Sequence, residues 1–374
     1  MNILFLAVDV DLRRDRGDAV HVRELASNLE SIGHSVRLMT STPPSDATEA
    51  FRHVTRPASS SAQVLVGREL AAGWADVIYE RRTSPKLSWA ISRLALMPFA
   101  LEVNGVLSDE RERPTEVAPE SLPGLRARIR RRMLLDAARI VSVSAGIRSD
   151  LISRYQLVPN HVVVIPNGAD TTHFRPMDRL SCRSRLGLDT APAVVCFVGN
   201  LVAWQGVEML LDASTRLASV RPDLNVLIIG DGPELPGLKE LAARMGLSDR
   251  VRFTGRVPYA MVPEYISASD VCVAPLSRGR KASPIKVFEY LACGRPVIVS
   301  DVDQIGEFVR RTGSGIVFEP EDINAFTAAI ESIVEHPRES EAMGGRGRAA
   351  VVDAGSWKQT AHEVASVLQQ ASRQ

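Results

Sequence analysis

The stretch from residue 278 to 303 holds the residues whose types and spacing point most directly to chemistry. Ser283 and Pro284 precede a short apolar run that Gly294 ends, which is the pattern of a short helix between two turns. The first amides of a helix have no partner within it and bind anions. Glu289 lies inside the apolar run, where an unpaired carboxylate would be costly, and one turn further along it is placed to hold a ribose diol. The stretch therefore predicts a site for a nucleoside diphosphate.

The same stretch carries the cations that such a site needs. Lys281 and Lys286 flank the start of the predicted helix, and Arg278 and Arg280 come just before it. Charge-assisted hydrogen bonds to a phosphate are stronger than neutral ones, so these side chains are candidates to offset the diphosphate charge. The alternative is that they are solvated surface charges.

Short runs rich in Val, Ile and Leu recur along the chain with helical patterns between them, which indicates parallel α/β units. The strands predicted in the first half are 3–8, 35–40, 77–80, 99–103, 140–144 and 162–165. Those predicted in the second half are 194–198, 226–229, 251–254, 271–274, 297–300 and 316–318. Two such sets predict two doubly wound parallel-sheet domains.

A length of 374 residues suits two domains with separate cores. We predict an N-terminal domain over residues 1–175, a C-terminal domain over 176–355, and a C-terminal helix over 356–374 that packs back on the N-terminal domain. Residues 41–63, which are rich in Ser, Thr, Pro and Ala, are predicted to form an exposed loop.

Composition argues against several classes of protein. The chain is 45% hydrophobic and 24% charged with a net charge of +1, so we expect no nucleic-acid partner. No apolar stretch is long enough to span a bilayer, and the N-terminal apolar run is too short for a signal peptide. The four cysteines show no close metal-ligand spacing, which fits a reducing cytoplasm; they are Cys182, Cys196, Cys272 and Cys293.

Ligands of open α/β sheets bind at the carboxyl ends of strands, so the loops after strands supply further candidates. Gly230 and Gly232 follow one predicted strand, and Gly199 and Asn200 follow another, ahead of Gln205. Glycine lets the backbone approach a ligand closely, although a tight turn without a ligand is the alternative. The spacing is not G-x-G-x-x-G, so no nicotinamide cofactor is expected.

Two early and two late carboxylates form Asp-x-Asp pairs in loops after strands. We interpret them as loop residues and predict no metal site; the pairs are Asp9 with Asp11 and Asp301 with Asp303. Gly17 and His21 mark the loop and the helix start that follow the first predicted strand. His21 is a candidate for the site; the alternative is that it is an ordinary helix residue with its hydrogen bonds made to neighbouring residues.

In chain order these segments resemble the retaining glycosyltransferases of family 4. The resemblance covers nearly the full length and is strongest from 194 to 320. Its motifs are Gly17…His21-Val-x-Glu-Leu, Gly33-His34-Ser-Val, Ser142–Gly146, Val164-Ile-Pro-Asn-Gly, Phe-Val-Gly with Trp-x-Gly, Gly230-Asp-Gly-Pro, Phe253-Thr-Gly and Ser283-Pro-Ile-Lys-Val-Phe-Glu-Tyr. It implies the GT-B fold, in which two Rossmann-like domains face each other across a cleft.

The resemblance also implies a set of donor-binding residues. Glu289 would bind the ribose, and the amides at the start of its helix would meet the diphosphate. Arg256 and Val257 lie where the family holds the nucleobase. The full set is Gly17, Gly199, Asn200, Gln205, Gly230, Gly232, Arg256, Val257, Ser283, Ile285, Lys286, Val287 and Glu289.

The chain departs from the family pattern at several of these positions. Many members have an Arg and then a Lys where this chain has Asn200 and Gln205, a Glu in place of Lys281, and a His in place of Asn104. A subset of the family resembles this chain in its Glu-x-Asn, Tyr-Glu-Arg and Ser-Pro-x-Lys motifs. The implied catalytic residues are Glu102, Asn104 and Lys281, and the candidates for acceptor binding are His21, Glu80, Arg81 and Glu110.

The resemblance implies retaining transfer of a sugar from a nucleotide-diphosphate donor, UDP before GDP, to a hydroxyl of a glycan, natural product or lipid-linked acceptor. It implies no metal and no cofactor other than the donor. One alternative is a sugar-nucleotide 2-epimerase of the same fold, and another is a non-catalytic nucleotide-sugar-binding protein. We expect a monomer or a homodimer.

Residues 122–140 form a basic amphipathic pattern. Arginines between Arg126 and Arg132 surround an apolar face that includes Ile129 and Met133. A helix of this kind can lie on anionic lipid, which predicts peripheral contact with the inner face of the cytoplasmic membrane. The alternative is that the apolar face packs on the N-terminal sheet.

Overall fold

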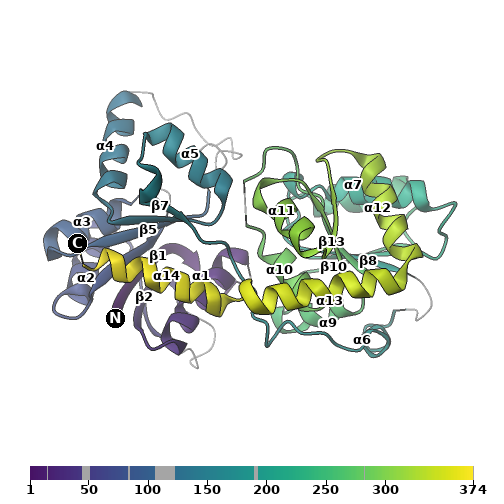
Figure 1. Cartoon of the computed structure of the whole chain (residues 1–374), viewed down its shortest axis with the longest axis horizontal. Coiled ribbons are helices and arrows are strands. Elements are labelled where there is room, and N and C mark those ends of the chain that lie inside the picture. Colours follow the sequence, from purple (N-terminus) through teal and green to yellow (C-terminus); the bar gives the residue numbers. More distant parts are fainter. Residues whose placement is uncertain are drawn as a thin grey trace. The chain divides into compact units, whose positions relative to one another are not determined.

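The computed structural model describes residues 1–14, 16–43, 51–82, 85–105, 123–188, 193–281 and 283–373, with the side chains of 123–126 left out. The chain forms two compact units (Figure 1). The first contains Met1–Asn167, Lys281–Ser283 and Trp357–Gln374, and the second contains Gly168–Arg280 and Pro284–Ser356. The first unit therefore ends shortly before the predicted boundary at 175, and the C-terminal helix belongs to it.

The first unit is built on a parallel seven-stranded sheet with the order β3-β2-β1-β4-β5-β6-β7. Its strands are β1 (Asn2–Asp11), β2 (Ser35–Thr42), β3 (Arg52–Thr55), β4 (Val77–Arg81), β5 (Phe99–Val103), β6 (Arg139–Ser142) and β7 (Val162–Val164). Its helices are α1 (Gly17–Ser31), α2 (Ser60–Ala71), α3 (Lys86–Ala95), α4 (Pro123–Asp136), α5 (Ala145–Tyr155), the short 3₁₀ turn η1 (Pro159–His161) and α14 (Trp357–Ala371).

Both faces of this sheet are covered by helices, which explains why its central strands bury apolar side chains on both sides. Ile3 and Phe5 of β1 pack with α1 and α14 on one face. Leu4 and Leu6, which point to the other face, pack with residues of α2, α3 and α5. Alternate side chains of β1 thus pack into two separate cores, one on each face of the sheet, as expected for a doubly wound unit.

The second unit repeats this plan with a parallel six-stranded sheet in the order β10-β9-β8-β11-β12-β13. Its strands are β8 (Val194–Val198), β9 (Asn225–Ile229), β10 (Val251–Gly255), β11 (Val271–Ala274), β12 (Val297–Ser300) and β13 (Gly315–Phe318). Its helices are α6 (Arg179–Arg185), α7 (Val207–Leu217), α8 (Leu235–Arg244), α9 (Val262–Ser267), α10 (Ile285–Ala292), α11 (Asp303–Thr312), α12 (Ile323–Glu335) and α13 (Pro337–Ala354), with 3₁₀ turns η2 (Ala203–Gln205) and η3 (Tyr259–Met261).

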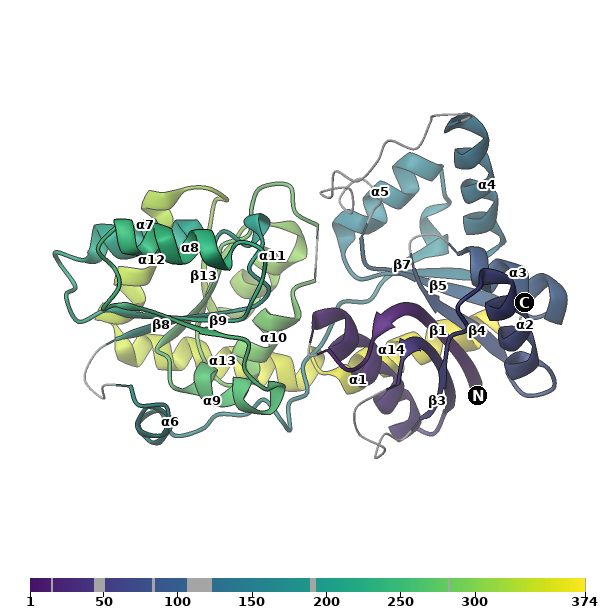
Figure 2. The same cartoon turned by 180° about the vertical axis from the view of Figure 1, so that it is seen from behind.

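Figure 2 shows α7, α8 and α12 on one side of this second sheet and α9 and α13 on the other. Val195 and Phe197 of β8 face the first group, whereas Val194 and Cys196 face the second. The predicted fold class, two doubly wound parallel-sheet α/β domains, is confirmed.

The prediction of an exposed loop over residues 41–63 is wrong for its described part. Arg52–Thr55 forms the edge strand β3, and α2 begins at Ser60 with the side chain of Ser59 as its cap. Strand β3 could not be predicted from apolar runs because Arg52, His53 and Thr55 are polar. An edge strand with little burial needs no apolar run.

Candidate functional site

The first turn of α10 presents free amides, as the sequence predicts for this helix. Pro284 is its N-cap and makes no side-chain capping bond. The amide of Val287 donates to the carbonyl of Pro284 at 3.0 Å. The amides of Ile285 and Lys286 have no partner among the described residues. Two amides therefore remain for an anion, and that of Val287 is already used.

Glu289 lies one turn further along α10 and is 6% exposed. Its Oε1 accepts a hydrogen bond of 2.8 Å from the hydroxyl of Tyr259, while Oε2 has no partner within the described part of the chain. Burial raises the pKa of Glu289 to about 7. The carboxylate is thus oriented by Tyr259 and keeps one oxygen for a ligand hydroxyl.

Lys286 reaches the loop that follows β8. Its Nζ donates to Oε1 of Gln205 and lies 3.9 Å from the ring centroid of Phe197. A Cβ added to Gly199 would lie only 3.3 Å from the same Nζ. The side chain is buried, and burial lowers its pKa to about 7.

Arg280, in the segment before α10, contacts the same loop. Its guanidinium lies 4.0 Å from the ring centroid of Trp204, the neighbour of Gln205. Arg280 and Lys286 therefore both contact the loop where the family pattern has its own cations.

The two remaining candidate cations pair with carboxylates elsewhere. Nζ of Lys281 lies 2.5 Å from Oδ1 of Asp150, on α5 in the first unit. Arg278 pairs with Glu321 at 3.5 Å, and both side chains are largely exposed. Neither Asp150 nor Glu321 could be predicted as a partner, because each is distant along the chain from the cation it pairs with.

The glycines after β8 and β9 let two loops pack backbone against backbone. A Cβ on Gly230 would lie 1.9 Å from the carbonyl oxygen of Gly199, and one on Gly232 would lie 2.2 Å from that of Leu201. The amide of Leu201 donates to the carbonyl of Asp231 at 2.9 Å, which joins the loops. This close approach accounts for the glycines without a ligand.

The other predicted donor residues are more dispersed. Asn200 and Arg256 are exposed, and Val257 packs at the margin of the core under α10. Gly17 begins α1 in the first unit.

A buried polar cluster forms around Glu102 of β5 in the first unit. Its Oε1 lies 2.7 Å from Nε2 of His21 and accepts a bond of 2.6 Å from Asn104. Its Oε2 accepts a bond of 2.7 Å from the hydroxyl of Tyr79, and Nε of Arg81 lies 3.5 Å from Oε1. Burial alone would raise the pKa of Glu102, but the charge and hydrogen bond of His21, with Arg81 and Asn104, lower it to about 2. The carboxylate is therefore ionised at neutral pH.

The second ring nitrogen of His21 faces Asn167. Nδ1 lies 2.7 Å from Oδ1 of Asn167, whose Nδ2 donates to the carbonyl of Ser283 at 2.6 Å. That bond fixes the amide orientation, so Nδ1 of His21 faces the amide oxygen of Asn167 while Nε2 faces the carboxylate of Glu102. The ring of Trp357 packs edge-on at 5.0 Å.

Sequence reasoning named His21, Glu102, Asn104, Arg81 and Ser283 separately, and the structure brings all five into one connected cluster. It missed the roles of Asn167, Tyr79 and Trp357. A signal for two of them was available: Asn167 lies in the Val164-Ile-Pro-Asn-Gly motif and Tyr79 in the Tyr-Glu-Arg motif.

Glu80 lies outside this cluster. It is 1% exposed, and its Oε2 accepts a bond of 2.9 Å from the amide of Ser88, whereas Oε1 has no partner among the described residues. Burial raises its pKa to about 7. The strand alternation of β4 separates Glu80 from its neighbours Tyr79 and Arg81. Glu110, also predicted as an acceptor residue, lies outside the described residues.

One carboxylate in each Asp-x-Asp pair is held by arginine. Asp11 pairs with Arg13 and Arg14 and accepts a bond from Thr42, and Asp301 pairs with Arg310.

Comparisons with known proteins find two family models that together match most of the chain. A family model described as Glycosyltransferase Family 4 matches residues 16–173, and one described as Glycosyl transferases group 1 matches residues 178–350. A GDP-mannose-dependent alpha-(1-6)-phosphatidylinositol monomannoside mannosyltransferase from Mycolicibacterium smegmatis is 32% identical over 261 residues, which cover 68% of this chain and 67% of that protein. The chain belongs to glycosyltransferase family 4.

Other relatives of this family 4 chain match over a shorter part. A D-inositol 3-phosphate glycosyltransferase from Geodermatophilus obscurus is 31% identical over 249 residues, or 64% of this chain and 54% of the relative. One from Rhodococcus jostii is 32% identical over 55% of this chain and 46% of the relative. The chain thus spans about half the length of these curated relatives.

Solved structures share the fold along the chain. Sucrose-phosphate synthase from Thermosynechococcus elongatus has a TM-score of 0.81 at 22% identity, with coverage of 99% of this chain and 98% of that one. HepE from Anabaena, solved in complex with UDP, has a TM-score of 0.82 at 19% identity, with coverage of 99% and 100%. The two-domain fold that the family 4 resemblance implies is therefore confirmed.

Proposed function

We propose that this family 4 chain is a retaining glycosyltransferase that moves a sugar from a nucleoside-diphosphate donor to an acceptor hydroxyl. The observation that carries the proposal is the start of α10, where the free amides of Ile285 and Lys286 precede the buried carboxylate of Glu289. An anion binds at such a helix N-terminus, and a carboxylate one turn away accepts hydrogen bonds from a ribose diol.

The same groups serve the departure of the leaving group. As the sugar–phosphate bond breaks, negative charge develops on the diphosphate, and preorganised donors aimed at it lower the barrier. The amides of Ile285 and Lys286 and the ammonium of Lys286 are such donors. The acceptor hydroxyl then attacks from the face that the diphosphate leaves, and a phosphate oxygen takes its proton. No protein nucleophile and no metal is required in this scheme.

The cluster around Glu102 supplies groups for the transferred sugar and the acceptor. Glu102 is ionised, and His21, Asn104 and Arg81 surround it with donors. Such a set of charged and polar groups is suited to orienting sugar hydroxyls, and His21 is itself positioned by the contact of its Nδ1 with Asn167. Lys281, a predicted catalytic residue, would have to act while paired with Asp150.

UDP is the first donor to test and GDP the second. HepE was solved with UDP, whereas the mannosyltransferase from Mycolicibacterium smegmatis is described as GDP-mannose-dependent. The printed names of the relatives include inositol phosphate and phosphatidylinositol mannoside enzymes, which favours a polyol phosphate, a glycan or a lipid-linked acceptor.

The test is product analysis with UDP- and GDP-sugars, with and without candidate acceptors. Transfer with the donor's anomeric configuration kept, as read from NMR coupling constants of the product, is the expected result. Epimerisation of the donor sugar without an acceptor would favour the 2-epimerase. Absence of binding to every nucleoside diphosphate would favour a non-catalytic role, and an inverted product would rule out retention.

Peripheral membrane contact through α4 is a further part of the proposal. Arg128, Ile129 and Leu135 are exposed on this helix. Arg131 donates to the carbonyl of Tyr155 and Arg132 pairs with Asp136, so fewer arginines are left for lipid. In the part of the chain that the structure describes, no helix is both long and apolar enough to cross a bilayer. Co-sedimentation with anionic vesicles tests the contact, which equal recovery with neutral vesicles would contradict.

A further inference from the structure

A cavity of about 270 Å³ lies at the amino edge of the second sheet, away from the first turn of α10. Ala193, Asp270 and Pro296 line it and directly precede β8, β11 and β12. Family 4 donor residues lie after strands, at the carboxyl edge, so this cavity is separate from the proposed donor site. Its volume suits a small ligand of a few heavy atoms.

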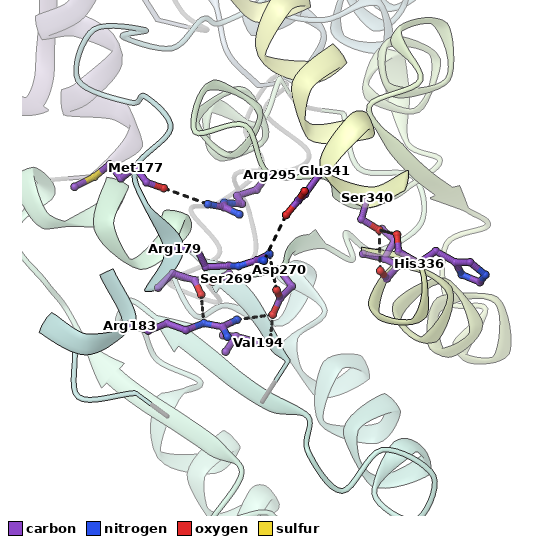
Figure 3. A network of polar contacts seen from close by, with 12 residues as sticks. Met177, Arg179, Arg183, Val194, Ser269, Asp270, Arg295, His336, Ser340 and Glu341 are labelled. Carbon is purple, nitrogen blue, oxygen red and sulfur yellow. Dashed lines mark hydrogen bonds and ion pairs between the residues drawn. The ribbon is translucent and has the colours of Figure 1, made fainter. Parts of the chain in front are cut away.

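The lining of the cavity carries more positive than negative groups. Four arginines face three carboxylates among the lining residues, namely Arg179, Arg183, Arg221 and Arg295 against Asp223, Asp270 and Glu341. Figure 3 shows how Asp270 is shared. Its Oδ1 lies 2.8 Å from Arg179, and its Oδ2 lies 2.6 Å from Arg183. Arg221 uses Asp223, at 2.9 Å.

Arg295 is the arginine without a carboxylate. The single hydrogen bond of its side chain in the described structure runs from Nη2 to the carbonyl of Met177 at 3.4 Å, and its Nε is buried without a partner. Burial and the nearby positive charge of Arg179 lower the pKa of Arg295. A guanidinium in this setting lacks the oxyanion that its planar donor geometry fits.

Arg179 is also only partly compensated. It shares Asp270 with Arg183, and its second ion pair, with the largely exposed Glu341, is long at 3.4 Å. The first turn of α13 lines the same cavity through Pro337 and Ser340. A helix N-terminus adds partial positive charge to that of the arginines.

We propose that this cavity binds the phosphate group of a small phosphorylated molecule, held between Arg295 and Arg179. The phosphate would accept from the Nη groups of Arg295, of which Nη2 has only the 3.4 Å bond to Met177, and replace the weak contact of Arg179 with Glu341. A purely structural ion-pair network would instead be expected to give each buried arginine its own carboxylate. The site does not depend on the donor chemistry of α10.

Isothermal titration calorimetry with inorganic phosphate, pyrophosphate and glycerol phosphate tests the proposal, at constant ionic strength set with chloride. The full chain should bind at least one of them saturably. Arg295→Gln should weaken that binding by about tenfold or more, the size of a lost charge-assisted hydrogen bond. Arg244→Gln, on the exposed face of α8, is the matched control and should change nothing.

Two further variants separate this cavity from the donor site and from a folding defect. Lys286→Met removes the donor-site cation and should leave phosphate binding at the cavity intact. Glu341→Gln removes a competing carboxylate that is 63% exposed, so the fold should hold and phosphate should bind more tightly. Three results would each overturn the proposal: no saturable binding by the full chain, full binding by Arg295→Gln, or loss of binding in Lys286→Met alone.

Discussion

The ammonium group of Lys286, on the first turn of α10, donates a hydrogen bond to the side-chain oxygen of Gln205, in the loop after β8. In the family pattern a lysine is expected at the position of Gln205. The structure thus holds a positive charge beside this loop, but the charge comes from α10 and Gln205 serves as its acceptor. The replacement of the family lysine by Gln205 and the presence of Lys286 on α10 are therefore linked, because the two side chains bind each other.

Replacing Lys286 by methionine should weaken donor binding by about 1–3 kcal/mol, because it removes the ammonium that offsets the diphosphate charge. Gln205→Ala should weaken it less, and should add little in the Lys286→Met background, because Gln205 acts by holding Lys286. Titration calorimetry with the preferred nucleoside diphosphate gives the four affinities. Lys239→Met, an exposed lysine of α8, is the control. Additive losses in the double variant would show that the two side chains act independently.

Donor binding should be coupled to proton uptake above neutral pH. The pKa of Lys286 in the free protein is lowered to about 7, so at pH 8 much of the amine is neutral. A bound diphosphate favours the charged amine, so a proton enters on binding at pH 8 and affinity falls as pH rises from 7 to 9. At pH 6 the amine is already charged and little uptake is expected.

Calorimetry in buffers of different ionisation enthalpy measures this uptake directly. Lys286→Met should abolish the lysine's share of it. An observed binding enthalpy at pH 8 that is the same in phosphate-free buffers of low and high ionisation enthalpy would contradict the coupling.

Glu80 should make the first unit less stable at alkaline than at acid pH. Its pKa is raised by burial from 4.5 to about 7, so its favourable, protonated state is present below pH 4.5 and is lost as pH rises through 7. Glu80→Gln should therefore unfold at higher denaturant than the wild type at pH 8, by up to about 3 kcal/mol, with no such gain at pH 4.5. Urea titrations at both pH values check this, with the exposed Glu69→Gln as control. A gain of equal size at both pH values would show a cause other than ionisation.

The free energy of unfolding should depend more on the carboxylate of Glu102 than on any single neutral residue that binds it. Glu102→Gln leaves the guanidinium of Arg81 without its carboxylate partner, and breaking a buried ion pair costs about 3–5 kcal/mol. Tyr79→Phe removes one hydrogen bond and should cost about 1 kcal/mol. Since the pKa of Glu102 is lowered to about 2, its contribution is present above pH 4.5 and is lost as pH falls through 2. Urea unfolding at pH 7 compares the two variants, and equal losses would contradict the ion-pair assignment.

The fold was readable from sequence because buried parallel strands leave apolar runs. Val194–Val198 and Val297–Ser300 are such runs, and both are strands as predicted. Arg52–Thr55 is an edge strand with polar residues, so the same reasoning could not find it.

The candidate site was readable only in part. Glu289 and the amides before it follow from local helix chemistry, which a linear motif carries. The contacts of Lys286 with Gln205 and of Lys281 with Asp150 join residues far apart in the chain, so no local pattern reports which cation reaches which partner. The same holds for His21, whose partners Glu102 and Asn167 come from β5 and from the segment after β7.

The central claim is that α10 binds the donor nucleotide through Glu289, and titration of the wild type, Glu289→Ala and Tyr259→Phe with UDP and GDP tests it most directly. The wild type should bind at least one nucleotide saturably, and Glu289→Ala should weaken that binding by about tenfold or more because the ribose loses its acceptor. Tyr259→Phe removes only the 2.8 Å hydrogen bond that orients the carboxylate, and should change affinity by less than about fivefold. Unchanged affinity in Glu289→Ala, or no binding of either nucleotide by the folded wild type, would contradict the claim.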